Sequence, residues 1–79
     1  MKIHDPKIFG QRLRVARVAH ELTLEQLAAM TGIKPSSLAR YERGEARPRE
    51  QRIKSLLFSL CVDFEWLNKP VKWKPRQSD

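Results

Sequence analysis

Two short helix-forming stretches joined by a tight turn around Gly32 constrain the fold more than any other part of the sequence. The first stretch opens at Thr23, which has the capping-box spacing with Gln26, and it ends at Gly32, a residue able to take a positive φ. The second begins at Pro35, which suits the first position of a helix, and it ends at Gly44. Two short helices joined this tightly must cross closely.

Side-chain sizes within the pair suit such a crossing. Ala28, four residues before Gly32, is small enough for the next helix to approach, and Leu38, six residues after it, is placed to fill the space between the helices and the core. This is the helix-turn-helix geometry, in which the second helix enters a DNA major groove. An αα-hairpin of a plain helical bundle carries the same signals, so the pair alone leaves both interpretations open.

Helix signals continue on both sides of the pair, and no segment alternates between apolar and polar residues as a strand does. Asp5 caps a helix that runs to about His20. Residues 50–60 carry an apolar stripe, and Asp63 caps a short last helix. The sequence therefore predicts an all-α class with five helices.

The length of 79 residues predicts one compact domain, which we place at residues 1–68. Residues 69–79 form a basic, proline-containing C-terminal tail. A chain of this size leaves no room for a second, ligand-sensing domain, so no small-molecule ligand is expected.

The charge of the chain favours a polyanionic partner. Its 16 Lys and Arg residues against 9 Asp and Glu residues give a net charge of +7, and a compact basic domain attracts nucleic acid. Every apolar stripe is needed for the core, which leaves none for a membrane surface. No apolar run is long enough to cross a bilayer, and the first residues lack the apolar stretch of a signal peptide, so we expect a cytoplasmic protein with no membrane partner.

The sequence offers little chemistry for catalysis or metal binding. Cys61 is the single cysteine, and His4 and His20 are far apart in sequence, so no zinc-ligand set is present. His20 falls on the same helical face as Phe9 and Leu13, which predicts a packed histidine. Because no nucleophile lies beside a base and no glycine-rich phosphate loop exists, we expect no enzyme activity, no cofactor and no metal.

The run LTLEQLAAMTGIKPSSLARYERG, preceded by FGQRLRVAR and followed by VDFEWL, resembles the phage Cro and cI repressor-type helix-turn-helix family. The resemblance covers roughly residues 7–68 and implies a compact five-helix lambda-repressor-like domain that binds double-stranded DNA. It implies a sequence-specific transcriptional regulator of phage or prophage type, a Cro-like repressor of a palindromic operator. It also implies that Arg17, late in the first helix, pairs with Glu42 and tethers the recognition helix.

The recognition helix, which begins at Pro35, carries the residues expected to contact bases. Ser36 and Arg40 lie four residues apart and share a face, and arginine pairs bidentately with guanine. We therefore assign Arg40, with Ser36 and Ser37, to base reading. Phosphates are expected at Thr23, where the preceding helix begins, and at nearby cations. Those cations are Lys34, Arg43, Arg47 and Arg49.

Several positions depart from the family pattern. Leu24 stands where the family often has a DNA-contacting glutamine, which leaves that contact open. Glu21 and Cys61 stand where glycine commonly ends a helix, so each residue either takes a strained positive φ or lengthens its helix slightly. Lys34 and Arg49 replace serine or threonine caps, and each loss of a cap costs about 1 kcal/mol.

Phe58 falls on the face of its helix where the family usually places a polar residue. An exposed aromatic side chain there predicts a partner surface, and we hypothesise a homodimer contact built from Phe58, Phe64, Glu65 and Trp73. In the alternative, the tail folds back and Trp73 covers Phe58 within one chain. A second functional interpretation is an antitoxin-type protein-binding module that also binds DNA, although a toxin-wrapping tail is usually longer and more apolar than residues 69–79.

Overall fold

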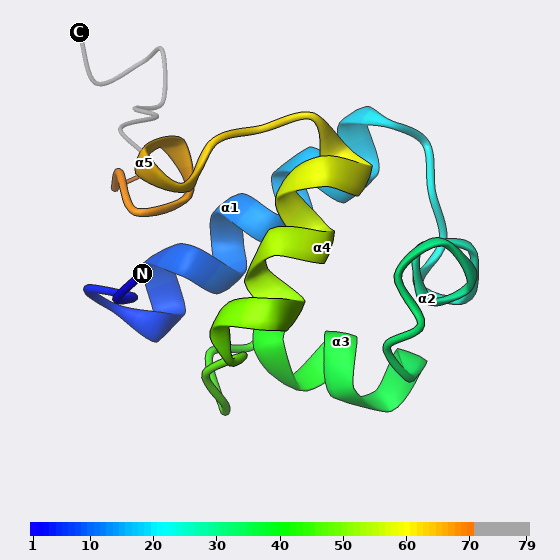
Figure 1. Ribbon diagram of the computed structural model, residues 1–79, viewed down its shortest axis with the longest axis horizontal. Helices are drawn as coiled ribbons and strands as arrows, with labels where there is room; N and C mark the ends of the chain where they lie inside the picture. The colour runs from blue at the N-terminus through cyan, green and yellow to red at the C-terminus, as the bar shows by residue number, and fades with distance from the viewer. Residues whose placement is uncertain (71–79) are drawn as a thin grey trace, which may run out of the picture.

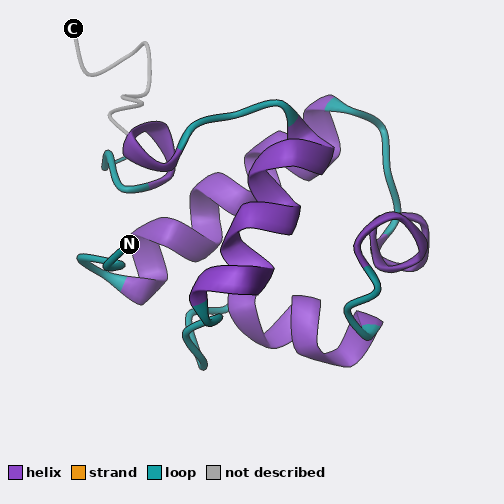
Figure 2. Cartoon of the chain, viewed as in Figure 1, coloured by secondary structure: helices purple, strands orange, loops and turns teal. Residues whose placement is uncertain are grey.

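The computed structural model describes residues 1–70, which form five helices joined by short loops (Figure 1). Their bounds are α1 Pro6–Ala19, α2 Leu24–Thr31, α3 Pro35–Glu42, α4 Glu50–Leu60 and α5 Phe64–Leu67. Within the described residues no strand is present (Figure 2). The predicted all-α class with five helices is confirmed.

The starts of the helices differ in how well their backbone N–H groups are satisfied. Thr23 and Gln26 form the predicted capping box at the start of α2, and Asp63 caps α5 by accepting from the Trp66 N–H at 2.7 Å. Lys34 and Arg49, by contrast, make no side-chain capping hydrogen bond. Proline follows Lys34, so α3 has one backbone donor fewer to satisfy at its start.

Among residues 1–70, four take the left-handed conformation past the ends of helices. Gly32 and Gly44 have φ values of 77° and 75°, as their places after α2 and α3 predict. Glu21 has a φ of 57° and Cys61 a φ of 56°, so of the two alternatives both take the strained conformation. For residues with a Cβ this conformation costs about 1–2 kcal/mol each.

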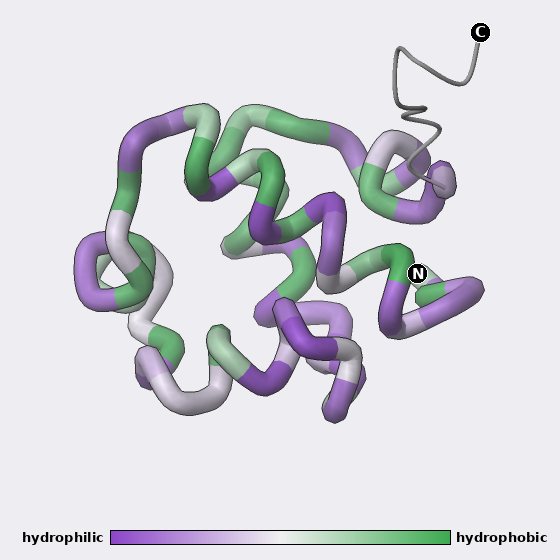
Figure 3. The backbone as a smooth tube through the Cα atoms, turned by 180° about the vertical axis from the view of Figure 1, so that it is seen from behind, coloured by the Kyte–Doolittle hydropathy of each residue, from purple (hydrophilic) through white to green (hydrophobic). Residues whose placement is uncertain are grey.

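The core draws apolar side chains from all five helices, and Figure 3 shows the helices alternating between hydrophobic and hydrophilic residues. The buried members are Ile3, Phe9, Leu13, Ala16, Leu27, Ile33, Leu38, Tyr41, Ile53, Leu56, Leu60 and Leu67. His20 is not among them: it is exposed, and its Nε2 lies 2.7 Å from the Leu60 carbonyl oxygen. The prediction of a packed His20 is wrong because α1 ends at Ala19 and its apolar stripe stops at Ala16.

Helix α1 crosses α3 at close range at Gly10. A Cβ added to Gly10 would lie 2.5 Å from the Glu42 carbonyl oxygen and 2.8 Å from its carbonyl carbon. Only a residue without a side chain fits there. Gly10 therefore sets how deeply α3 docks on α1, a role that the sequence analysis did not assign to it.

Arg12 connects α1 to the end of the described chain. Its guanidinium lies 4.6 Å from the centre of the Trp66 ring and donates to the carbonyl oxygens of Lys69 and Pro70 at 2.9 and 3.0 Å. The predicted domain boundary at residue 68 is thus followed by two residues that still contact α1. Among residues 1–70, no helix is long and apolar enough to cross a membrane.

Candidate nucleic-acid interface

Helix α3 buries one face and exposes the other. Leu38 and Tyr41 are buried, whereas Ser36 and Arg40 are exposed on the opposite side, one turn apart. Ser37 is half-buried beside them. The predicted orientation of the helix is confirmed, and base reading by Ser36, Ser37 and Arg40 stays a prediction.

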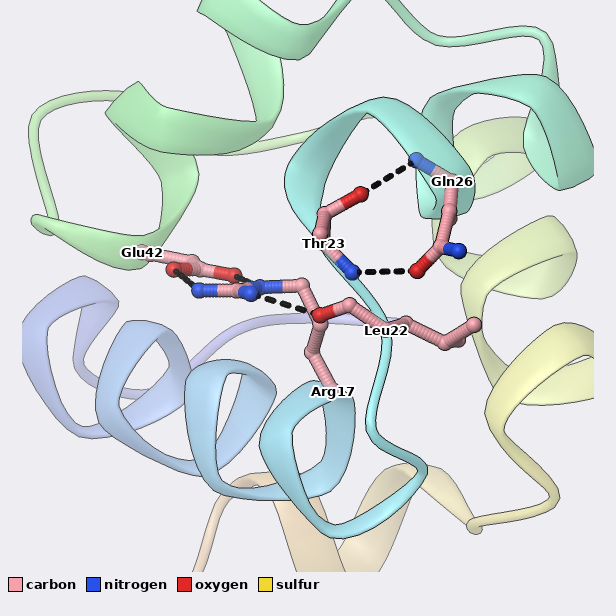
Figure 4. Close-up of polar contacts among 5 residues, drawn as sticks. All are labelled: Arg17, Leu22, Thr23, Gln26 and Glu42. Atoms are coloured by element: carbon pink, nitrogen blue, oxygen red, sulfur yellow. Dashed lines mark hydrogen bonds and ion pairs between the residues drawn. The ribbon is translucent and has the colours of Figure 1, made fainter.

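A partly buried ion pair holds the far end of α3. The Arg17 Nε donates to Glu42 Oε2 at 2.6 Å and its Nη2 donates to Oε1 at 3.0 Å (Figure 4). The two side chains are only 13% and 8% exposed, and the hydrogen bonds that Arg17 donates to Glu42 raise the pKa of Arg17 against the opposing effect of burial. The pair implied by the resemblance is present, and it fastens the C-terminal end of α3 to α1.

The same guanidinium also positions the start of α2. Arg17 Nη1 donates to the carbonyl oxygen of Leu22 at 2.8 Å, directly before the capping residue Thr23 (Figure 4). Thr23 Oγ1 accepts from the Gln26 N–H at 3.0 Å, and Gln26 Oε1 accepts from the Thr23 N–H at 2.8 Å. One arginine thus fixes both the beginning of α2 and the end of α3, the two elements that a helix-turn-helix unit brings to DNA.

The exposed cations of α3 differ in their partners. Lys34 precedes the helix and is exposed, as is Arg40. Arg43, at the C-terminal end, donates from Nε to Glu45 Oε2 at 2.9 Å and from Nη2 to Oε1 at 3.1 Å. This hydrogen bond raises the pKa of Arg43 and lowers that of Glu45. Sequence reasoning missed Glu45, for which the available signal was a carboxylate two residues after Arg43.

A cationic hollow, which we call the arginine cleft, lies between α3 and the start of α4. It has a volume of about 410 Å³ and is lined by Tyr41, Arg47, Arg49, Gln51 and Arg52. Arg52 Nη1 donates to the Tyr41 hydroxyl at 2.7 Å, so a core residue of α3 orients this arginine. Sequence reasoning missed Arg52, whose only signal was its place one turn into a helix that follows the recognition helix.

Arg47 has a structural partner as well as a place in the arginine cleft. Its Nη1 donates to the carbonyl oxygen of Ile3 at 2.7 Å and holds the segment before α1. Arg49 lines the same cleft, and the structure gives its side chain no capping role. Of the two loop cations predicted to bind phosphate, Arg49 is therefore the freer one.

The residues predicted to form a dimer contact lie along two different grooves. Phe58, which is 87% exposed, lines a groove with Met30, Leu57, Ser59 and Cys61, which we call the Phe58 groove. Phe64 and Glu65 line another groove, together with His4, Asn68, Lys69 and Pro70. Trp73 lies outside the described residues. Met30, 53% exposed, joins Phe58 from α2, a neighbour that the sequence analysis did not identify.

Comparison with known proteins gives consistent relatives. A helix-turn-helix family model matches residues 13–67. YobD of Bacillus subtilis, described as an uncharacterised HTH-type transcriptional regulator, is 41% identical over 59 residues, which are 72% of this chain and 53% of that protein. RghR of the same organism, described as an HTH-type transcriptional repressor, is 35% identical over 60 residues, 75% of this chain and 44% of that protein. The chain spans about half the length of these curated relatives.

Solved structures share the same arrangement of helices. The restriction-modification controller protein C.AhdI from Aeromonas hydrophila has a TM-score of 0.74 and 34% identity, covering 78% of this chain and 94% of that one. The clp gene regulator ClgR from Corynebacterium glutamicum has a TM-score of 0.73 and 25% identity, covering 78% and 81%. The likeness therefore extends over most of the fold and is not restricted to the α2–α3 pair.

Proposed function

We propose that this chain, which belongs to the helix-turn-helix family of Cro and cI type and has the lambda-repressor-like fold, is a transcriptional regulator that reads duplex DNA with α3. Membership of this family also confirms the prediction that the chain is not an enzyme. The observation that carries the proposal is the exposed Ser36–Arg40 face on a helix that the Arg17–Glu42 pair holds from behind. A rigidly presented polar face is what major-groove recognition requires.

Base reading is proposed for Arg40, with Ser36 and Ser37 beside it. Within residues 1–70 no hydrogen bond or ion pair engages the Arg40 guanidinium, so contact with guanine O6 and N7 breaks no existing bond. Serine hydroxyls donate and accept, which suits contacts to either base edges or phosphates. Leu24, at the position of the family's glutamine, is half-buried and packs against the core, so it supplies no polar contact.

Phosphate contacts are proposed on both sides of α3. The start of α2 offers free backbone N–H groups and the Thr23 hydroxyl, whose oxygen already accepts from Gln26 and whose proton remains to donate. On the other side, Arg49 and the arginine cleft face the beginning of α4. Lys34 and Arg43 lie at the two ends of α3, and Arg47 adds positive potential while it holds Ile3.

A homodimer on a palindromic operator completes the proposal. Phe58 and Met30 leave an apolar groove exposed on a small domain, and a second copy of the chain is the occupant we propose. Two copies place their recognition helices on half-sites about one helical turn, ~34 Å, apart. RghR is described as a repressor, and we propose repression here too, of the Cro kind and in the cytoplasm where the DNA is. No observation among residues 1–70 favours the antitoxin alternative, and most of the tail on which that alternative depends lies outside the described residues.

Selection of bound sites from random duplex DNA tests the proposal, since a palindrome reports both sequence and symmetry. On the selected site, Arg40→Ala is expected to lose about 1–3 kcal/mol of binding free energy and to relax one base position. Lys34→Ala is the matched control and should weaken all sequences similarly and flatten the salt slope by about 1. Equal, sequence-independent losses from both variants contradict the assignment of Arg40 to base reading.

The dimer has its own test. Sedimentation with and without the selected duplex is expected to show self-association that Phe58→Lys abolishes, because a charge cannot be buried in an apolar contact. Glu65→Lys, on the neighbouring groove, serves as the control and should leave that association intact. If Phe58→Lys sediments as wild type does and Glu65→Lys dissociates the dimer, the contact lies on the groove of Phe64 and Glu65 instead.

A further inference from the structure

We infer that Glu45 is a positioning residue: it holds the Arg43 guanidinium so that the free edge of this group meets a DNA phosphate. The inference rests on the proposed function, because it concerns how one of the proposed phosphate contacts is prepared. It assigns a role in DNA binding to a carboxylate, a group that on charge alone opposes DNA.

The geometry of the pair leaves part of the guanidinium unused. Glu45 accepts from Nε and from one N–H of Nη2, which is the side-on edge of Arg43. The other edge, formed by Nη1 and the second N–H of Nη2, has no hydrogen-bond partner within residues 1–70. That edge matches a phosphate through two parallel hydrogen bonds. Glu45 therefore orders the long Arg43 side chain without occupying the edge that recognises phosphate.

The backbone fixes Glu45 in place for this task. Past the end of α3, the Gly44 N–H donates to the Tyr41 carbonyl oxygen at 3.1 Å and the Glu45 N–H donates to the Arg40 carbonyl oxygen at 2.9 Å. With Gly44 at a φ of 75°, this is a Schellman motif, which sets the direction of the chain at Glu45. The Glu45 carboxylate thus starts from a defined position beside Arg43.

The C-terminal end of α3 is an unfavourable position for the Glu45 carboxylate unless other interactions compensate. The negative end of the α3 dipole repels it, and so does any phosphate that approaches the neighbouring cations. Arg43, through its hydrogen bond, and the nearby Arg40 and Lys7 compensate by lowering the pKa of Glu45. Two explanations are compatible with that arrangement: Glu45 screens the crowded cations, or it positions Arg43 for DNA.

The two explanations predict opposite signs for one substitution. If Glu45 only contributes negative charge, Glu45→Gln removes repulsion and DNA binding tightens. If Glu45 positions Arg43, the neutral amide holds the guanidinium less firmly and the affinity falls by about two- to tenfold, which is the cost of ordering one long side chain on binding. We expect the fall, measured on the selected duplex at fixed salt.

A double-mutant cycle assigns the effect to Arg43. In an Arg43→Ala background, Glu45→Gln is expected to tighten binding slightly, because only the repulsion is left to remove. Glu25→Gln, which removes a carboxylate from the first turn of α2, is the matched control for the loss of a negative charge near DNA and should not weaken binding. Melting curves of all variants show whether the fold is intact.

The outcomes separate this inference from the function on which it rests. Tighter binding by Glu45→Gln in the wild-type background, or an equal loss with and without Arg43, overturns the positioning role while the protein still binds DNA. If the wild-type chain selects no duplex at all, the proposed function fails, and the role of Glu45 fails with it.

Discussion

Two arginines near α3 each pair side-on with a glutamate, yet their surroundings give the two pairs different roles. The side chains of the Arg17–Glu42 pair are 13% and 8% exposed, and the remaining nitrogen of Arg17, Nη1, donates to the Leu22 carbonyl oxygen. The Arg43–Glu45 pair is 57% and 51% exposed and leaves an edge of the guanidinium free. The same side-on pairing therefore fastens α3 to α1 through Arg17 and Glu42. At the C-terminal end of α3 it leaves an edge of Arg43 available to a ligand.

The difference between the pairs follows from solvent. A charge left alone in the partly buried place loses hydration that nothing replaces, so breaking the Arg17–Glu42 pair is costly. In the exposed place water replaces either partner, so the Arg43–Glu45 pair contributes little to stability. The comparison teaches that the role of a buried pair is measured by protein stability, and that of an exposed pair by DNA binding.

Among the variants that test this comparison, we expect the largest effect, a loss of stability, from Arg17→Met. The substitution leaves the Glu42 carboxylate without its partner and removes the hydrogen bond to Leu22, so we expect a loss of about 3 kcal/mol in the free energy of unfolding. Urea denaturation followed by circular dichroism measures it. Arg43→Met is the matched control and should unfold at nearly the same urea concentration as wild type. Similar losses for both variants remove the distinction between the two pairs.

The second prediction concerns the close crossing that accompanies the buried pair. Gly10→Ala places a methyl group against the backbone of α3, which cannot yield as a flexible side chain does, and we expect a destabilisation of about 1–3 kcal/mol. Gly32→Ala is the control: its Cβ meets nothing within 4 Å, so its cost of about 1–2 kcal/mol comes from the positive φ alone.

These two glycine variants separate a steric from a conformational cost. DNA binding of the folded Gly10→Ala variant should fall as well, because α3 is displaced from α1. Gly32→Ala strains only the turn between α2 and α3 and leaves the crossing of α1 and α3 in place. Unchanged unfolding and unchanged DNA affinity in Gly10→Ala contradict the view that this crossing sets the docking of α3.

The smallest effect is expected at the exposed pair and depends on pH. The pKa of Glu45 is lowered, so the part of its pairing energy that depends on ionisation is complete above the ordinary glutamate pKa and is lost as the pH falls through the lowered value. Carboxyl-carbon NMR titration should show Glu45 protonating below the ordinary glutamate range. In Arg43→Met, or in high salt, its pKa should rise toward that range. An unshifted Glu45 that responds to neither change shows that the pair is not formed in solution.

Local signals were enough to predict the helices. The capping box at Thr23, Pro35 at the start of α3 and the glycines after α2 and α3 act through hydrogen bonds and φ angles within a few residues, so their consequences are visible in sequence. The buried and exposed faces of α3 followed from helical periodicity. The Arg17–Glu42 pair was inferred from the family resemblance, since 25 residues separate its members.

The sequence by itself determined where the helices lie, their core stripes apart from His20, and the exposure of Arg40, because these depend on neighbours along the chain. Only the tertiary structure decided the Gly10 crossing, the Arg47 bond to Ile3 and the meeting of Met30 with Phe58. Those features depend on the angles and depths at which helices pack. Such distances between residues far apart in sequence are set by the whole core at once.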